Sequence, residues 1–479
     1  MDRIWSWAIL VFFAFLLVIG IFADAYPNSI YLPPLIGLVI VMCAAWRLRQ
    51  GMPSLLSTQA LIIIALGLVW MVLQTVPLPV GIWTKFPGHG FVLETLNAAK
   101  LAPSAMPISL DAQTGFQDFL YLLSGVAVFL AGLSVPPQER RFVAFGICIL
   151  AVLSSLLGLA QRFGGVASPL QFFAAQGWIN GGFFSNHNFL AAQLYCAIPF
   201  AAALAIGLGQ KRVVHWAVAA LFALAALIVY LSGLGATGSR AGIVFAMISV
   251  LLSGVLLWAK SQLPNQTSAI SSKAMIFFIA ALLLVTAQFG LAGILRLAQT
   301  DPVSDYRAVM ATTSLEVARA YFPFGSGFGS FVPVYAIFEH PANLKEFYVN
   351  HAHNDWLELF LEGGLPMALV LLLFVAWLLR AIFVLWRNAG PDDGLNKACV
   401  IIIALLLAHS LTDYPLRTRM LLALFALCCS WLAVGPLPIT SKVRRATPNV
   451  PAAPQMGPTP APSRREGPYF VPRPRPPES

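Results

Sequence analysis

Long apolar runs, separated by short polar segments, dominate the chain from its beginning to about residue 435. An α-helix that crosses the ~30 Å hydrocarbon core of a membrane needs about 20 such residues. The runs lie at residues 5–22, 30–46, 58–76, 116–134, 142–160, 188–209, 213–233, 242–259, 274–294, 364–386, 398–412 and 419–435. The pattern therefore predicts an all-α polytopic membrane protein with about twelve transmembrane helices.

Three of the predicted outer loops are long enough to hold structure of their own, at about 77–115, 161–187 and 295–354. The last is the largest, and apolar residues recur at helical spacing within its segment 304–322. We therefore expect a large periplasmic loop that carries short helices. The sequence shows no internal repeat, which disfavours the transporter folds that are built from repeats.

After residue 435 the composition changes to proline and arginine, with almost nothing apolar to bury. Segments of this kind are disordered or adopt polyproline II. We therefore divide the chain into a membrane domain at 1–435 and a disordered cytoplasmic tail at 436–479. The tail is expected to be a solvated tether whose arginines touch the membrane surface, and a docking site for a partner is the alternative.

Composition and charge support this picture and give it an orientation. The chain is 59% hydrophobic and only 10% charged, which is typical of a membrane-embedded protein. With both termini in the cytoplasm, 19 of the 29 Lys and Arg residues lie inside, whereas the opposite orientation leaves ten there. The net charge of +10 indicates attraction to anionic membrane lipids, and nothing further supports nucleic-acid binding.

The first apolar run could also be a cleaved signal peptide, because "MDR" precedes it and "ADA" follows it. A signal peptide usually has an apolar region of about 7 to 15 residues. The run at 5–22 is longer, so we expect the first transmembrane helix here.

Two arginines on the predicted outer face are not explained by topology. Arg240 is the single charge of "GLGATGSRAG", where it could snorkel to the interface or bind an anion. Its place on the outer side favours anion binding. Arg307 has no acidic residue four positions before or after it, so it is free to bind another anion. The nearby "GSGFG" lacks the strand and helix context of a phosphate-binding loop.

Two further polar segments lie at the ends of predicted spans. In "GGFFSNHNFLAAQL" either Asn186 or Asn188 could cap the following helix, and Asn188 is also a candidate substrate contact. In "HSLTDYPLRTR" His409 and Asp413 are one helical turn apart. This pair could be structural or could contact a substrate.

The densest polar segment is "VNHAHNDWLE". Its H-x-H-x-D pattern resembles part of a dinuclear zinc site, but Trp356 stands where a further histidine usually follows, so no metal or cofactor is expected. Asp355 and Glu358 have the spacing of a capping box, which predicts a helix that runs to Gly363 and Gly364. The positive end of that helix dipole favours a neutral imidazole in the histidines ahead of it. A neutral histidine can accept a proton.

A neutral histidine together with two outward arginines suits one particular reaction. A sugar carried on a lipid pyrophosphate has a weakly basic leaving group, which needs cations rather than an acid. The attacking sugar hydroxyl gains from a base within hydrogen-bonding reach. The set is therefore sufficient for direct displacement at the anomeric carbon with inversion and without a metal.

Three motifs together resemble the O-antigen ligase and O-antigen polymerase superfamily of bacterial inner-membrane glycosyltransferases. They are "TGSRAG", the Arg307 segment followed by "FPFGSGFGSF", and "HAHNDWLELFLEGGLP", and the resemblance covers about 180–420. It implies a GT-C-like fold with a periplasmic active site, in which His353 is the base and Arg240 and Arg307 bind the pyrophosphate. The implied donor is a glycan on undecaprenyl pyrophosphate, and the implied acceptor is a saccharide.

Further candidates for contact with the substrate or support of the base are His351, Asn354, His409 and Asn188, of which His351 has no assured counterpart in the family. The resemblance also extends to "HSLTDYPLRTR", which marks Arg417 as a candidate for binding the acceptor or the pyrophosphate. It leaves open whether the acceptor is lipid A core, another lipid-linked repeat or a protein. A flippase or transporter of lipid-linked sugars is the alternative from another class. That alternative predicts charges within several spans, whereas the predicted spans are almost free of charge.

Overall fold

The computed structural model describes residues 2–22, 29, 31–174, 179–210, 216–261, 302–346, 348–388, 393–435, 469 and 471–473. The chain divides into two compact units, Met1–Leu437 and Pro438–Ser479. In the second unit only Tyr469 and residues 471–473 are described, and they are exposed. The disorder of the tail at 436–479 therefore stays a prediction, and the first unit contains every feature discussed below.

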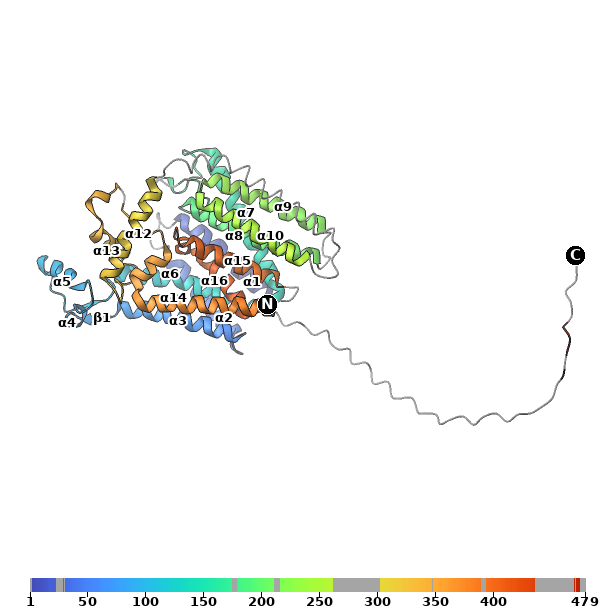
Figure 1. The fold of residues 1–479 in the computed structure, drawn as a ribbon, viewed down its shortest axis with the longest axis horizontal. Helices are drawn as coiled ribbons and strands as arrows, with labels where there is room; N and C mark the ends of the chain where they lie inside the picture. Colours follow the sequence, from blue (N-terminus) through green and yellow to red (C-terminus); the bar gives the residue numbers. More distant parts are fainter. Residues whose placement is uncertain are drawn as a thin grey trace, which may run out of the picture. The chain divides into compact units, whose positions relative to one another are not determined.

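Eleven helices of the first unit match apolar runs of the sequence (Figure 1). Their bounds are α1 Asp2–Phe22, α2 Leu32–Arg47, α3 Leu55–Thr75, α6 Ala112–Leu133, α7 Pro137–Gly164, α8 His187–Gln210, α9 Trp216–Thr237, α10 Arg240–Ser261, α14 Asp355–Arg387, α15 Gly394–His409 and α16 Arg419–Val434. The predicted span at 274–294 lies outside the described residues. The runs that match the eleven helices are long and apolar, and in lipid such a run has to satisfy its own backbone hydrogen bonds, which a helix does.

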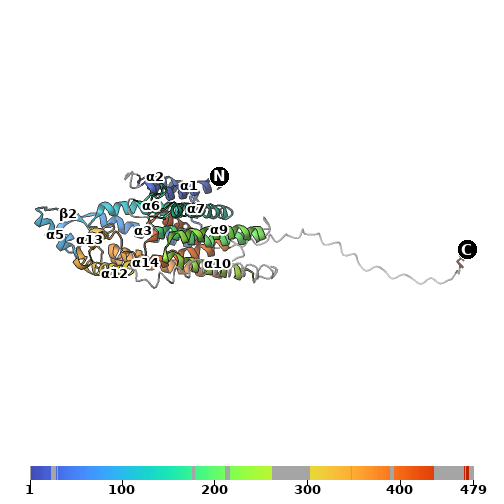
Figure 2. The ribbon, with the colours of Figure 1, turned by 90° about the horizontal axis from the view of Figure 1, so that it is seen from above.

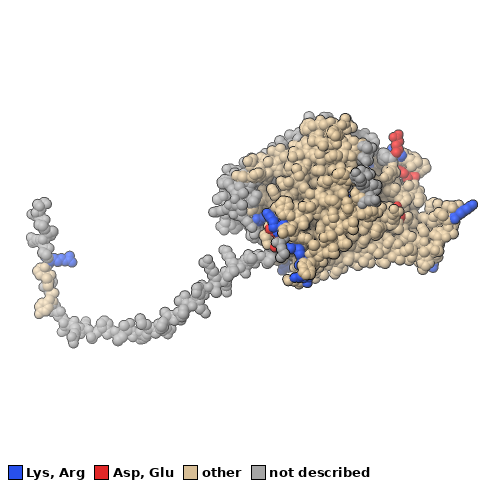
Figure 3. Space-filling view, turned by 180° about the vertical axis from the view of Figure 1, so that it is seen from behind, with Lys and Arg blue, Asp and Glu red and all other residues tan. Residues whose placement is uncertain are grey.

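Within the described residues, six of these helices are long and apolar enough to cross a membrane: α1, α3, α6, α7, α8 and α14. The other five have apolar stretches of 10–17 residues. On the face seen in Figure 3, charged side chains lie toward the two ends of the first unit, with a broad uncharged band between them. The helical membrane character is thus confirmed, whereas the count of twelve spans and the GT-C-like arrangement stay predictions.

The helices differ in how deeply they lie within the bundle. α8 buries 72% of its apolar window, whereas α3 and α14 bury only 22% each. α8 is therefore central, and α3 and α14 are peripheral and face the surroundings over most of their length. Small residues allow close contacts at the centre, where an added Cβ at Gly242 of α10 would meet Ala191 of α8.

Two of the predicted outer loops fold together into a lobe at one end of the bundle (Figures 1 and 2). Its elements are β1 Pro77–Pro79, α4 Val80–Trp83, α5 His89–Ala98, β2 Ala105–Pro107, α12 Pro302–Ala320, α13 Phe331–Phe338 and the 3-10 helix η3 Pro341–Asn343. The two loops meet through ring contacts such as His89 against Tyr321 and Phe86 against Phe324. The short helices expected in the loop 295–354 are therefore present.

The lobe adds one small exception to the predicted all-α fold, because β1 and β2, of three residues each, form a two-stranded antiparallel sheet. Leu78 pairs with Met106 in this sheet, and prolines stand at both ends of β1 and at the end of β2. A residue that precedes proline is held extended, and proline cannot continue a helix. Proline spacing therefore produces strands where the hydrophobic pattern alone shows only a loop.

The glycine-rich segment after α12 joins the lobe to the bundle. Gly325, Gly327 and Gly329 all have positive φ, and an added Cβ at each would overlap backbone atoms of neighbouring elements. The Gly329 amide donates to Glu362 Oε1 at 3.0 Å, and the Gly327 amide donates to the Glu362 carbonyl at 2.9 Å. These amides are used within the fold, so the segment is a structural joint and not a phosphate cradle.

α14 bends at Gly364, which has φ 61° and ψ −154°. The break predicted at Gly363 and Gly364 is therefore confirmed. It separates a short first helix from the membrane-spanning part, and Leu365 N donates to Pro323 O at 2.7 Å across the bend. The bend fixes the first helix, and the polar segment ahead of it, against the lobe.

Candidate functional site

The segment 351–355 connects the lobe to the start of α14. Asn354 caps the helix, since its Oδ1 accepts from Leu357 N at 3.0 Å, and its Nδ2 donates to Leu411 O at 3.1 Å. His353 has φ 50°, a left-handed conformation that is uncommon outside glycine and often marks functional positions. The capping box predicted for Asp355 and Glu358 is wrong, because Asn354 has the capping role.

Asp355 and Glu358, the two acids of the expected capping box, bind other parts of the fold instead of capping the helix. Asp355 Oδ2 accepts from Ser410 Oγ at 2.7 Å, which ties α14 to the end of α15. Glu358 is fully buried, and its carboxylate binds His351 Nδ1 at 2.9 Å and Ala352 N at 2.8 Å. Both buried acids therefore fix the position of the segment 351–355.

His353 belongs to a group of side chains around the carboxylate of Asp413, which we call the Asp413 cluster. Its members are Asp413, His353, Arg307, Asn188 and His409. Asp413 is 1% exposed, and its Oδ1 is 3.2 Å from His353 Nδ1. A carboxylate can only accept, so Nδ1 carries the proton and the other ring nitrogen, Nε2, is left as an acceptor.

The remaining members approach the other oxygen of Asp413. Asn188 Nδ2 donates to Oδ2 at 2.7 Å, and a terminal nitrogen of Arg307 lies 3.8 Å from the same atom. Burial raises the pKa of Asp413, but the hydrogen bond from His353 and the charge of Arg307 outweigh it, and the pKa lies below its ordinary value. Asp413 is therefore ionised at neutral pH.

Arg307 is only partly engaged by Asp413. It lies on α12, its side chain is 34% exposed, and its buried Nε has no hydrogen-bond partner. A contact of 3.8 Å is an ion pair without a close hydrogen bond. The guanidinium therefore keeps donors for a further anion.

His409 and Asn188 occupy less accessible positions than a substrate contact would suggest. His409 is fully buried, its Nδ1 lies 2.9 Å from the Tyr195 hydroxyl, and its Nε2 lies 3.9 Å from Asp413. Asn186 caps the start of α8 by accepting from Asn188 N at 2.8 Å. Both residues therefore hold Asp413 from inside the bundle.

Arg240 begins α10 and is exposed. The first turn of α10 packs on α8, because Gly242 lies against Ala191. Ala191 is one helical turn beyond Asn188, which binds Asp413. Arg240 therefore lies at the same end of the bundle as the Asp413 cluster, although it comes from a distant part of the sequence.

Arg417 is the centre of a second group, the Arg417 cluster, which consists of Arg417 and four carboxylates. Its nitrogens lie 3.0 Å from Glu358, 3.4 Å from Glu362, 3.7 Å from Asp355 and 4.0 Å from Asp118. Burial lowers the pKa of Arg417, but the carboxylates raise it further, and the pKa lies above its ordinary value. Arg417 is thus engaged in an internal ion-pair network, and its expected contact with the substrate stays a prediction.

Tyr414 contacts both histidines of "HAHND". Its ring centre is 4.8 Å from that of His353 and 4.5 Å from that of His351. Burial, with the charge of Asp413, raises the pKa of Tyr414 to about 12, so it is neutral. The two histidines of "HAHND" thus face different surroundings: His353 contacts Asp413, and His351 contacts Glu358 of the Arg417 cluster.

Part of the chain is similar to a known protein family. The family model for O-antigen ligases matches residues 225–373. This part of the chain is therefore similar to O-antigen ligases. The match includes Arg240, Arg307 and the segment 351–355, so the resemblance drawn from the three motifs is confirmed. No curated protein matches the chain.

The O-antigen ligase family is one of membrane-bound enzymes of surface polysaccharide synthesis, and the helical membrane character of this chain agrees with that. Within the part of the chain that the structure describes, no group of three or more His, Cys, Asp or Glu side chains could hold a metal ion. Metal independence of the reaction stays a prediction.

The sequence singles out Asp413, the central residue of the site, only as a possible partner of His409. The only signal is its spacing of four from His409, which fits a structural pair equally well. Its partner His353 is 60 positions away in the sequence. A contact across that distance depends on how α14 and α15 pack and has no local pattern.

Proposed function

We propose that this O-antigen ligase homologue transfers a glycan from undecaprenyl pyrophosphate to a saccharide hydroxyl at the periplasmic face of the bacterial inner membrane. The observation that carries the proposal is the contact of His353 Nδ1 with the buried, ionised Asp413, beside the incompletely paired Arg307. This arrangement supplies a base and a cation within one group of side chains.

His353 acts as the base. Asp413 holds the proton on Nδ1, so Nε2 is free to accept the proton of the acceptor hydroxyl. The hydroxyl oxygen then bonds to the anomeric carbon as the bond from that carbon to the pyrophosphate oxygen breaks. Attack from the side opposite the leaving group inverts the configuration, and the pyrophosphate leaves as an anion. Asp413 stabilises the imidazolium that forms.

Arg307 and Arg240 bind the pyrophosphate. A terminal nitrogen of Arg307 lies 3.8 Å from the carboxylate of Asp413, and the buried Nε has no hydrogen-bond partner. A phosphate oxygen can therefore add hydrogen bonds to this guanidinium. Arg240 comes from the exposed start of α10 at the same end of the bundle. Two planar guanidinium forks suit the oxygens of a pyrophosphate, and their charge stabilises the leaving group without proton transfer.

The test is the transfer rate of purified full-length protein in lipid nanodiscs, measured with an undecaprenyl-pyrophosphate glycan and a saccharide acceptor. His353→Ala is expected to lower the rate about 10²–10⁴-fold, the usual contribution of a general base. His340→Ala is the matched control, because His340 lies exposed in the same lobe and only caps η3. Excess EDTA is expected to leave the wild-type rate unchanged. A near-normal rate for His353→Ala would remove the proposed base.

A further inference from the structure

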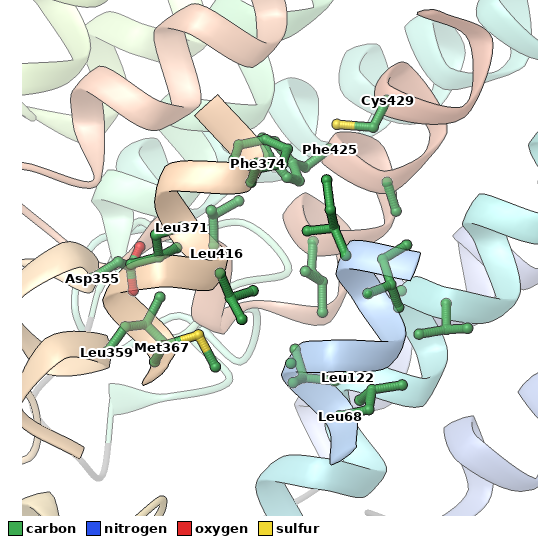
Figure 4. Close-up of a pocket in the computed structure, with 18 of the residues that line it drawn as sticks. Leu68, Leu122, Asp355, Leu359, Met367, Leu371, Phe374, Leu416, Phe425 and Cys429 are labelled. Carbon is green, nitrogen blue, oxygen red and sulfur yellow. The ribbon is translucent and has the colours of Figure 1, made fainter. Parts of the chain in front are cut away.

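An elongated cavity of about 430 Å³ lies between α3, α6, α14 and α16 (Figure 4). Leu68 and Leu122 form one side of it, and Leu359 and Met367 form the other. Asp355 marks one end. A volume of this size is within the range of about 300–1,000 Å³ that is usual for sites that bind small molecules.

The walls of the cavity follow the helices. The lining residues recur at intervals of three and four along each helix: Ala60, Ile63, Ile64, Gly67, Leu68 and Met71 on α3, and Met367, Val370, Leu371, Phe374 and Trp377 on α14. A rise of 1.5 Å per residue makes each stripe about 15 Å long. α6 and α16 contribute apolar stripes of the same kind, such as Leu122 to Phe129. The shape is therefore that of a hydrocarbon chain that lies along the spans.

The cavity is next to the surroundings of the protein, and not at its centre. Two of its walls are α3 and α14, which bury only 22% of their apolar windows. At Gly67 of α3 an added Cβ would lie 3.7 Å from Val370 of α14, an ordinary contact distance, so these two helices pack closely there. Because both helices are peripheral, the cavity lies close to the membrane lipids.

Residues of the Arg417 cluster line the polar end of the cavity. Asp118, Asp355, His351 and Arg417 line it, and the cluster contains four carboxylates for one guanidinium. Asp118 is the most accessible of these acids, with 33% of its side chain exposed. Burial raises the pKa of Asp355 to about 7 and that of Glu362 to about 8. Burial also acts to raise the pKa of Glu358, but Arg417 and His351 outweigh it and lower that pKa to about 2. Glu358 is therefore the ionised partner of Arg417, and a phosphate here would have to compete with it for that cation, whereas a hydroxyl group can donate to a carboxylate oxygen.

We propose that this cavity binds the hydrocarbon chain of a membrane lipid whose polar end is hydroxylated and carries no phosphate. The chain lies between α3 and α14, and its hydroxyl donates to Asp118 or Asp355. The bound polar end lies beside His351, which contacts Glu358, whereas His353 contacts Asp413. The lipid is therefore separate from the donor pyrophosphate, and its binding does not depend on the transfer reaction.

The test uses two probes that differ only at the polar end: a sixteen-carbon alcohol with a diazirine on its chain, and the phosphate ester of that alcohol. Purified full-length protein is irradiated with each probe in detergent micelles, and labelled peptides are measured by mass spectrometry. The alcohol is expected to label α3 and α14 saturably, and unlabelled alcohol is expected to block the label. The phosphate is expected to label them at least about tenfold less, because it has to compete with Glu358 for Arg417.

One variant and its control locate the site. Gly67→Leu adds a side chain to the cavity wall beside Val370 and is expected to lower alcohol labelling about tenfold, whereas the control Gly20→Leu, on α1 with no atom within 4 Å of an added Cβ, leaves it unchanged.

Three results would overturn the proposal: labelling of α1 and α2 as strong as that of α3 and α14, labelling that does not saturate, or stronger labelling by the phosphate than by the alcohol. Saturation and competition are measured on the wild-type protein, so they decide the matter even where Gly67→Leu does not fold. The labelling needs no turnover, so its outcome is separate from that of the proposed transfer reaction.

Discussion

The Asp413 cluster and the Arg417 cluster are each linked to Tyr414 through a histidine, His353 or His351, and combine carboxylates and arginine in opposite proportions. In the first, a single carboxylate is shared by Arg307 and His353, with Asn188 and His409 behind it. In the second, a single guanidinium is shared by four carboxylates. Only the first has a cation with hydrogen-bonding capacity left for another anion.

This difference shows why the presence of an arginine is a poor guide to phosphate binding. Arg417 and Arg307 are both near a conspicuous histidine, but the nitrogens of Arg417 reach carboxylates at 3.0 Å and 3.4 Å. A phosphate would have to displace those partners and leave buried acids without a counter-charge. The local ratio of acids to cations therefore assigns the anion site to Arg307 and a structural role to Arg417.

The largest effect on the fold is expected from Arg417→Ala. It leaves Glu358 and Glu362, which are both fully buried, without their cation, and breaking a buried ion pair in this way costs about 3–5 kcal/mol. The apparent melting temperature and the yield of folded protein measure the loss. Arg319→Ala is the control, because Arg319 is exposed on α12. An unchanged melting temperature for Arg417→Ala would show that the cluster does not stabilise the fold.

A smaller effect, on activity and not on the fold, is expected from Arg307→Lys. Lysine keeps the charge but loses the planar fork. Hydrogen bonds to charged groups are worth about 1.5–3 kcal/mol, so the transfer rate is expected to fall about 10–100-fold while the melting temperature changes little. Arg319→Lys, on the same helix, should keep the wild-type rate. A wild-type transfer rate in Arg307→Lys would show that Arg307 acts only through its charge and not through its planar fork.

Much of the fold could be predicted from the sequence because lipid leaves the backbone little choice. Long apolar runs have to be helical, and eleven of the predicted runs match helices in the described residues. The break at Gly364 was also predictable, because two glycines interrupt a helical pattern there. The sheet of β1 and β2 was not, because its residues have no alternating hydrophobic pattern and depend on proline spacing.

The candidate site could be predicted only where its signal was local. His353 and Arg307 stood out because each is a polar residue without an obvious partner nearby in the sequence. Asp355 and Glu358 were misread for the same reason: a capping box is a local pattern, whereas their partners include Ser410 and Arg417, which come from more than 50 positions away. The charge ratio of a cluster depends on such distant contacts.

The central claim is that Asp413 acts through His353, and a double-mutant cycle tests it most directly. Transfer rates are measured for wild-type protein, Asp413→Asn, His353→Ala and the double variant in the same nanodiscs. Asp413→Asn is expected to slow the wild-type enzyme, because Nδ1 loses the carboxylate that orients the ring, and to change the His353→Ala enzyme little. The coupling energy is expected to be about 0.5–3 kcal/mol. Equal slowing by Asp413→Asn in both backgrounds would contradict the account.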